Sequence, residues 1–217
     1  MIRFENVSKF YRTRNGRKTV FKNLDLCLRK GDALGICGHN GAGKSTLLQL
    51  IAGVEQASSG TIDRKMSVSW PIGYASAFQS SLTGADNVRF IARIYGKSIE
   101  ETLEFVDDFA ELGGYMAMPI RTYSSGMIAR LAFAVSLAVD FDCYLVDEVT
   151  SAGDARFRKR CHEALEARRE NGTLVMVSHD PDTLRQYCET GAVIADGNLL
   201  GFDTLDAAID RHFGPGH

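Results

Sequence analysis

The sequence contains no apolar stretch long enough to cross a membrane as a helix. Its first residues, MIRFENVSKFY, also lack the apolar segment of a secretory signal peptide. Because both features are missing, we expect a protein that is made and kept in the cytosol. Any attachment to a membrane would then depend on a partner protein.

Cysteine is scarce, and its spacing excludes two common uses of the residue. The five cysteines are odd in number, and no two of them are separated as in a CxxC motif. A disulfide framework and a zinc site are therefore not expected. Cys37 and Cys143 lie in apolar runs typical of buried strands, which predicts reduced thiols inside the core.

The sequence has no strong excess of one charge. Lys and Arg number 25, Asp and Glu number 27, and the formal net charge is −2. This near balance argues against a nucleic-acid-binding protein, which would carry a strongly basic surface. Basic side chains gather locally within residues 12–18 and 156–160. A solvated face is the first interpretation of both clusters, and contact with phosphate or a membrane surface is the alternative.

Short strands are predicted in the first part of the chain. Residues 2–7 and 20–28 alternate apolar and polar side chains, and the Asn-Gly pair at 15–16 is typical of a hairpin turn. Residues 33–37, ALGIC, form a continuous apolar run that predicts a strand buried on both faces. Residues 45–53 carry apolar side chains at helical spacing and end at a glycine, which predicts a helix.

The strand pattern disappears between about residues 84 and 138. Three segments there, DNVRFIARIYG, IEETLEFVDDFAEL and MIARLAFAVSLAV, have the spacing of helices. Beyond this stretch the pattern predicts strands at 143–148 and 173–178, a hairpin at 191–203, and helices at 153–170 and 203–213. Strands that alternate with helices around a helical insertion predict an α/β fold.

Residues 38–46, GHNGAGKST, match the phosphate-loop pattern G-x-x-x-x-G-K-[ST]. They follow the buried strand and open the helix, which is the context that the motif requires. The glycines let backbone N–H groups point at phosphate oxygens, and the helix dipole adds to the attraction. Lys44 is predicted to contact the β- and γ-phosphates, Ser45 to bind Mg²⁺ and Thr46 to contact the α-phosphate. The predicted nucleotide-binding loop comprises Gly38, His39, Asn40, Gly41, Ala42, Gly43, Lys44, Ser45 and Thr46.

Two predicted strands end in polar side chains that suit a phosphate site. The segment CYLVDE ends in Asp147 and Glu148, and acids at the carboxyl end of a parallel strand face the ligand crevice of an α/β sheet. Asp147 is predicted to bind Mg²⁺ and Glu148 to act as the general base, a pair of surface carboxylates being the alternative. In LVMVSHD, residues 174–180, a predicted buried strand ends at His179, which is predicted to hydrogen-bond the γ-phosphate, a structural histidine being the alternative.

A second helix start has the character of an anion site. In TYSSGM, residues 122–127, hydroxyl side chains and a glycine precede an apolar helical run. The free N–H groups at such a helix start attract anions. No lysine follows the glycine, in contrast to the phosphate loop, so these residues alone do not identify the anion.

Together these elements resemble the ATP-binding-cassette (ABC) ATPases over essentially the whole chain. The order of motifs agrees: the phosphate loop, Gln79 in AFQ, the helical segment, YSSGM, CYLVDE, TSAGD and SHD. The resemblance implies one ABC ATPase domain over 1–217, with an α/β P-loop NTPase core and an N-terminal antiparallel β subdomain at about 1–83 and 139–217. An inserted helical subdomain is expected at about 84–138.

The resemblance also gives a role to the helix start that lacks a lysine. YSSGM resembles the signature motif of the family, which binds the γ-phosphate of an ATP held by a second copy. Two copies would then stack head to tail around two ATP molecules with their Mg²⁺. The common signature is LSGGQ, so Tyr123, Ser125 and Met127 are departures that imply altered contacts at the rim. Ser124 and Gly126, the expected phosphate contacts, are retained.

Three further roles are implied by the resemblance. Gln79 resembles the residue that contacts Mg²⁺ and the attacking water and couples the helical subdomain to the membrane partner. Asp154 resembles an aspartate at the dimer seam. Tyr11 lies where the family stacks an aromatic ring on adenine, an exposed strand-end tyrosine being the alternative. Val149 and Gly153 depart from the family pattern near the seam.

Several segments are similar to the branch of the family that exports polysaccharides, most of all to ATP-binding subunits of capsular polysaccharide exporters. These segments are YSSGM, SLTGADN, SWPIG and VDEVTSAGDARF. The resemblance implies a peripheral protein on the cytoplasmic face of the bacterial inner membrane, bound to an integral membrane permease near Ser80, Ser81 and Leu82. O-antigen, teichoic acid or another lipid-linked glycan is the alternative cargo. A non-transport ABC ATPase and a P-loop kinase are the alternative classes.

Overall fold

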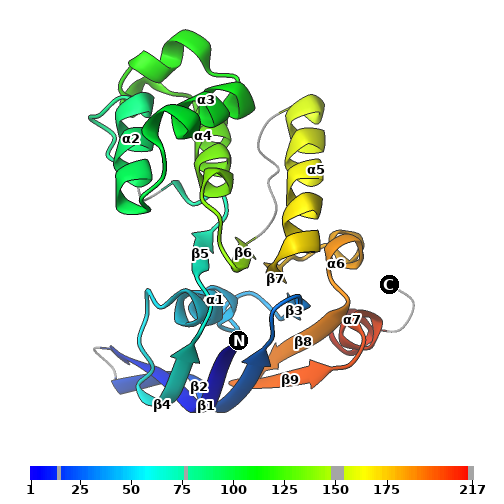
Figure 1. Ribbon diagram of the computed structural model, residues 1–217. Helices are drawn as coiled ribbons and strands as arrows, with labels where there is room; N and C mark the ends of the chain where they lie inside the picture. The colour runs from blue at the N-terminus through cyan, green and yellow to red at the C-terminus, as the bar shows by residue number, and fades with distance from the viewer. Residues whose placement is uncertain (14–15, 76–77, 148–153, 215–217) are drawn as a thin grey trace. The chain divides into compact units, whose positions relative to one another are not determined.

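The computed structural model describes residues 1–13, 16–75, 78–147 and 154–214 (Figure 1). The chain divides into two compact units, and each is described here by itself. The first unit comprises residues 1–70, 141–149 and 166–217, and the second comprises residues 71–140 and 150–165.

The N-terminal strands of the first unit form a three-stranded antiparallel sheet in the order β2-β1-β4 (Figure 1). Strands β1 and β2 are longer than the alternating pattern predicts, and they pair as far as Thr13 opposite Gly16. The predicted turn residue Asn15 lies outside the described residues. The bounds are β1 Ile2–Thr13, β2 Gly16–Leu28 and β4 Ser59–Arg64.

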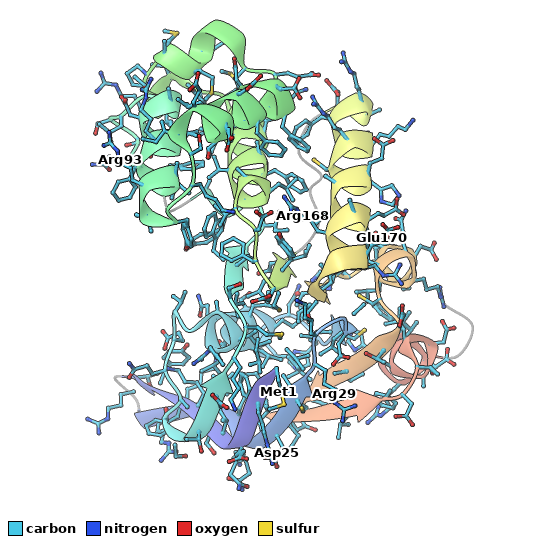
Figure 2. The ribbon with its side chains drawn as sticks, viewed as in Figure 1. Met1, Asp25, Arg29, Arg93, Arg168 and Glu170 are labelled. Atoms are coloured by element: carbon cyan, nitrogen blue, oxygen red, sulfur yellow. The ribbon has the colours of Figure 1, made fainter. Side chains whose placement is uncertain are left out.

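A shift in register bends β1 between Phe4 and Val7. Asn6 there adopts a left-handed backbone with φ 49°, and its N–H donates to Asp25 Oδ1 at 2.8 Å. Figure 2 labels Asp25 on β2. A carboxylate that accepts from the backbone in this way offsets the ladder hydrogen bond that the bulge removes.

The second sheet is a six-stranded, mostly parallel sheet with the order β5-β6-β7-β3-β8-β9. Strands β3, β6, β7 and β8 are parallel, and β9 runs antiparallel to β8. The carboxyl ends of β3, β6 and β7 therefore share one edge, which is where ligands bind in such sheets. The bounds are β3 Ala33–Cys37, β5 Val68–Pro71, β6 Cys143–Asp147, β7 Thr173–Val177, β8 Thr190–Ala195 and β9 Asn198–Phe202.

Three helices belong wholly to the first unit, namely α1 Lys44–Ala52, α6 Pro181–Tyr187 and α7 Leu205–Phe213. Helix α1 packs its apolar side into the core, where Leu47, Leu48 and Ile51 are fully buried with Ile36 of β3. Burial of each such side chain stabilises the fold by about 1.5–3 kcal/mol. This packing fixes the start of α1 beside the end of β3.

The second unit is helical. Its helices are α2 Gly84–Ile94, α3 Ile99–Ala110 and α4 Ser125–Ala138, with short 3₁₀ turns at Gly113–Ala117 and Ile120–Thr122 and the first part of α5 Ala155–Asn171. The side chains of Thr83, Ser98 and Ser124 cap α2, α3 and α4 by accepting a backbone N–H. The rings of Phe109, Phe133 and Phe157 lie within 6.2 Å of one another, between centroids. This aromatic cluster forms part of the buried core of the unit.

Helix α5 crosses the boundary between the units, and its last turns pack in the first unit. The guanidinium of Arg168, labelled in Figure 2, lies 5.6 Å from the centroid of the Tyr144 ring on β6. Within the described ranges, every helix is too short or too polar to span a bilayer.

All five cysteines are free thiols. Burial raises the pKa of Cys37 to about 11 and that of Cys143 to about 12. Thiols that hold their protons this firmly are unreactive, so they act as small apolar core residues.

Candidate nucleotide site

The phosphate loop leaves the end of β3 and opens α1 through Gly43. Gly43 caps the helix with φ 114°, a backbone region open to glycine, and no side chain caps the first turn. A Cβ atom at this position would lie 2.6 Å from Cγ1 of Val20 and 2.9 Å from Cζ of Phe21. The loop can therefore lie against β2 and present its N–H groups to a ligand only because residue 43 is glycine.

Lys44 is held inside the loop. Its side chain is buried, and Nζ donates to the carbonyl oxygens of Gly38 at 2.6 Å and His39 at 3.2 Å. An ammonium taken out of water needs such acceptors. The charge is thus placed at the predicted phosphate position before any anion binds.

Ser45 and Asp147 come together from α1 and β6. The Ser45 hydroxyl donates to Asp147 Oδ2 at 3.3 Å. One hydroxyl and one carboxylate oxygen form an incomplete set of hard oxygen ligands, which suits Mg²⁺ because that ion keeps waters and takes further oxygens from substrate phosphates. Across the described ranges, no group of three or more His, Cys, Asp or Glu side chains could hold a metal by itself. The Ser45 hydroxyl and the Asp147 carboxylate are of the ligand type that fits a magnesium ion.

A single pocket of about 580 Å³ joins these groups. Its lining includes residues of the phosphate loop together with Asp147, His179 and Tyr11. The structure thus brings together the predicted residues of the first unit that it describes. The lining residues are Tyr11, Lys18, Thr19, Val20, His39, Asn40, Gly41, Ala42, Gly43, Lys44, Ser45, Thr46, Asp147, His179, Asp196 and Gly197.

Five lining residues were not predicted from the sequence, namely Lys18, Thr19, Val20, Asp196 and Gly197. They reach the pocket through long-range pairing. Lys18 lies opposite Tyr11 in the β1–β2 register, and the N–H of Lys22 donates to the carbonyl of Gly197 at 3.0 Å. The strand register that places them is a property of the sheet and has no local motif.

His212 lies near the end of α7. Burial is the main cause that lowers its pKa, and the nearby charge of Lys44 lowers it further.

The predicted general base Glu148 follows Asp147 directly and lies outside the described residues. The departures Val149 and Gly153 also lie outside them. A strand was predicted at 143–148, and β6 is observed at Cys143–Asp147, with Asp147 as its last residue.

The predicted signature lies in the second unit, at the start of α4. Ser124 is the N-cap, and its Oγ accepts the N–H of Met127 at 3.3 Å. Ser124 and Ser125 are exposed, while Gly126 and Met127 are partly exposed. Tyr123 instead points into the unit, where its hydroxyl donates to the carbonyl of Tyr115 at 2.6 Å. A Cβ on Gly84 would lie 2.3 Å from that hydroxyl, so the glycine at position 84 leaves the room that the Tyr123 side chain occupies.

Gln79 also lies in the second unit, where its side chain is exposed. Its backbone is fixed by the buried Asn87, whose Oδ1 accepts the Gln79 N–H at 2.8 Å. Nδ2 of Asn87 donates to the carbonyls of Gln79 at 3.2 Å and Thr83 at 2.9 Å. One amide side chain thereby shapes the loop that presents Gln79.

Asp154 precedes α5 in the same unit and uses both carboxylate oxygens. Oδ1 accepts the N–H of Phe157 at 2.9 Å, and Oδ2 accepts from Nη2 of Arg130 at 2.8 Å. The bond from Phe157 is the largest cause that lowers the pKa of Asp154, and the charge of Arg130 adds to it. The residue is therefore an anion at neutral pH.

The ABC transporter family model matches residues 21–151, and the chain belongs to this family. It is 50% identical to the ATP-binding protein BexA of Haemophilus influenzae over 212 residues, which are 98% of each chain. It is 49% identical to the capsule polysaccharide export ATP-binding protein CtrD of Neisseria meningitidis serogroup B, again over 98% of each chain. The resemblance inferred from the motifs is confirmed.

One solved structure with a similar fold is the dimeric ATP-binding cassette MJ0796 in a post-hydrolysis state bound to ADP and Pi. It superposes with a TM-score of 0.75 at 23% identity, covering 92% of this chain and 96% of that one. This likeness confirms the predicted α/β fold of an ABC cassette.

Proposed function

We propose that the chain is the ATP-hydrolysing subunit of an exporter of capsular polysaccharide. The observation that carries the ATP part is the pocket that joins the phosphate loop, Lys44, Ser45 and Asp147. The assignment to capsule export is supported by the 49% sequence identity, over 98% of each chain, to a protein named for capsule polysaccharide export.

The residues of the pocket divide the work of holding ATP. The N–H groups of residues 38–46 and the Lys44 ammonium bind the β- and γ-phosphates, and Tyr11 stacks on the base. Ser45, Asp147 and Gln79 hold Mg²⁺, which when bound offsets the charge of the phosphate oxygens. Ser45 and Asp147 are already in hydrogen-bonding contact, which supports their part of this assignment.

Two side chains are assigned to the hydrolysis step. Glu148 accepts a proton from the attacking water, and His179 donates a hydrogen bond to the γ-phosphate. The position of His179 in the pocket lining supports its role. The place of Glu148 directly after Asp147 in the sequence supports the other.

A second copy of the chain completes the site. The start of α4, with Ser124, Ser125 and Gly126, binds the γ-phosphate of an ATP held by the other copy, with Tyr123 and Met127 at the edge of the motif. Asp154 lies at the seam of this head-to-tail homodimer. The exposure of both serines and the dimeric state of a cassette with the same fold support this arrangement.

A permease in the bacterial inner membrane is the other partner, and the chain binds its cytoplasmic side. The segment from Gln79 to Leu82 is the contact that we assign to it. Leu82 exposes 43% of its surface, beside the exposed Ser80 and Ser81, which supports a docking role.

The test uses a tagged Glu148→Gln variant, which should bind ATP but barely hydrolyse it. It would be purified with ATP from detergent-solubilised membranes of cells that normally make the protein, and Lys44→Met would be purified in parallel. We expect a polytopic membrane protein in stoichiometric amount with each variant, and a nucleotide-stabilised dimer with Glu148→Gln alone. A soluble homodimer without a membrane protein would contradict the transport function and favour a mechanical ABC ATPase.

The cargo requires a separate experiment in the same cells. Deletion of the chain should abolish surface capsule and leave the lipid-linked polymer inside. The wild-type chain should restore export, and Glu148→Gln should not. Loss of another surface glycan with an intact capsule would contradict the cargo assignment while leaving the ATPase assignment untouched.

A further inference from the structure

Arg130 lies inside the second unit, at the meeting point of three helices. It is on α4, six residues after the cap Ser124, which corresponds to about 9 Å along the helix axis. Only 17% of its side chain is exposed. Its guanidinium also lies 4.8 Å from the centroid of the Phe157 ring on α5, which orients it by a cation–π contact.

The charged partners of Arg130 come from both neighbouring helices. Nη2 donates to Asp154 Oδ2 at 2.8 Å, next to the start of α5. Nη1 lies 3.6 Å from Glu111 Oε2 and 3.5 Å from the carbonyl of Ala110, both at the end of α3. A planar guanidinium with several fixed N–H directions can bridge such partners, which a lysine ammonium does with less geometric definition.

Glu111 is the common partner of three arginines. It ends α3 with a left-handed backbone at φ 54°, a conformation that costs free energy in any residue with a side chain. Besides Arg130, it pairs with Arg156 at 3.0 Å and with Arg160 at 3.3 Å. Arg156 is 83% exposed, whereas Arg130 is largely covered. Arg130 is therefore the member of this group that joins Glu111 to Asp154 inside the unit.

Asp154 connects Arg130 to the first turn of α5. Its second oxygen caps the first turn of α5 through the Phe157 N–H at 2.9 Å. Arg130 consequently ties the cap of α5 to the helix whose first residues are the signature. The two segments that the proposed dimer turns toward the other copy are thus joined by one hydrogen-bonded ion pair, in which the arginine is largely covered and the carboxylate is 63% exposed.

We propose that Arg130 is a positioning residue for ATP hydrolysis, whose guanidinium sets Asp154 relative to the signature at the start of α4. The inference rests on the proposed function, because both segments matter only if a second copy brings its ATP to them. Arg130 itself touches no nucleotide. It acts by holding two contact segments at a fixed separation, so that they engage the other copy together.

The test compares Arg130→Met with Arg156→Met in the purified full-length chain. Both substitutions remove an arginine from Glu111, and the Arg156 variant leaves the bond to Asp154 intact. We expect Arg130→Met to lower kcat about tenfold, with ATP affinity of the monomer unchanged because the pocket lies in the first unit. Arg156→Met should keep kcat within a factor of about two. Arg130→Lys should recover part of the loss.

A double-mutant cycle with Asp154→Asn separates positioning from general stability. If Arg130 acts through Asp154, the double variant should be no slower than the slower single variant. Additive losses in kcat, or equal losses in the Arg130 and Arg156 variants that track a lower Tm, would overturn the proposal. So would a kcat for Arg130→Met within twofold of wild type. If Arg130→Met does not fold, the kcat of Asp154→Asn decides the question. An unchanged kcat in that variant would show that Arg130 does not act on hydrolysis through Asp154.

The outcome is distinguishable from failure of the proposed function. A wild-type chain that hydrolyses no ATP would refute the ATPase assignment. An active wild type with an unaffected Arg130→Met variant would refute the positioning role alone.

Discussion

Helices α1 and α4 differ in how their first turns are capped and in whether a cation lies beside them. Helix α1 is capped by Gly43 without any side-chain hydrogen bond, and the buried Lys44 ammonium stands in the loop. Helix α4 is capped by Ser124, whose hydroxyl already accepts the N–H of Met127, and it brings no cation. In the proposed function, the first start binds a phosphate of its own chain's ATP, and the second binds a phosphate that another chain holds.

The glycines of the two starts sharpen this difference. Gly43 is required by its own subunit, because a Cβ there would meet Val20 at 2.6 Å. Gly126 has no such neighbour: the nearest atom to a Cβ is Ser124 Oγ at 4.0 Å, and its backbone is helical. Glycine in a helix costs about 0.5–1 kcal/mol relative to alanine. A cost without a reason in its own subunit supports close approach by a second molecule.

The largest expected effect is the loss of the cation at the first start. Lys44→Met should lower kcat/KM for ATP by about 10³-fold, or about 4 kcal/mol, because a preorganised charge on the phosphates is removed. Steady-state ATPase assays measure this. Lys18→Met, which removes an exposed lysine from the same pocket, is the matched control and should lose less than about tenfold. Equal losses in both variants would contradict the assignment of Lys44.

A smaller effect is expected on stability at the same start. Gly43→Ala should lower the free energy of unfolding by about 2–4 kcal/mol, because it adds left-handed strain to a clash with Val20 and Phe21. Urea unfolding without nucleotide measures the change. Gly41→Ala is a matched control, since φ is 79° there and nothing lies within 4 Å of the new Cβ. It should cost strain alone, about 1–2 kcal/mol. Identical losses would show that the clash is relieved by movement of β2.

The smallest effect is expected at the second start, with the opposite sign. Gly126→Ala should raise the free energy of unfolding of the isolated chain by about 0.5–1 kcal/mol, because alanine favours the helix. The same variant should lose ATPase activity if a second copy approaches this glycine closely. Urea unfolding and ATPase assays on one preparation measure both. A variant that is more stable and fully active would contradict the role of this helix start in the dimer.

The sequence allowed the local parts of the fold to be predicted because each has a local physical cause. The apolar run 33–37, the glycines of 38–46 and the capped helix at 125–138 all occur where the pattern indicated. Residues 60–74 show only a mixed pattern of strand and turn, without clear strand bounds. Strand β4, Ser59–Arg64, pairs with β1 there over sequence separations of 51 to 62 residues. No local pattern carries a pairing of that range.

The site residues that belong to local motifs could be predicted from the sequence, and those placed by long-range pairing could not. Lys44, Ser45 and Asp147 follow from motifs and meet in the structure. Lys18 was noticed only within a basic cluster interpreted as a solvated face, because its place opposite Tyr11 depends on the β1–β2 register. Arg130 was not singled out, since a lone arginine in an apolar helix gains meaning only from partners on two other helices.

The glycine at position 43 also bears on how such a chain can change over generations. A substitution there disturbs folding through Val20 and Phe21 before it has any opportunity to alter nucleotide chemistry. Selection at this position therefore acts first on the folding stability of the protein and only afterwards on its ATPase activity. At Gly126 we expect the reverse order: a substitution should leave folding intact and act only on the proposed contact with a second copy.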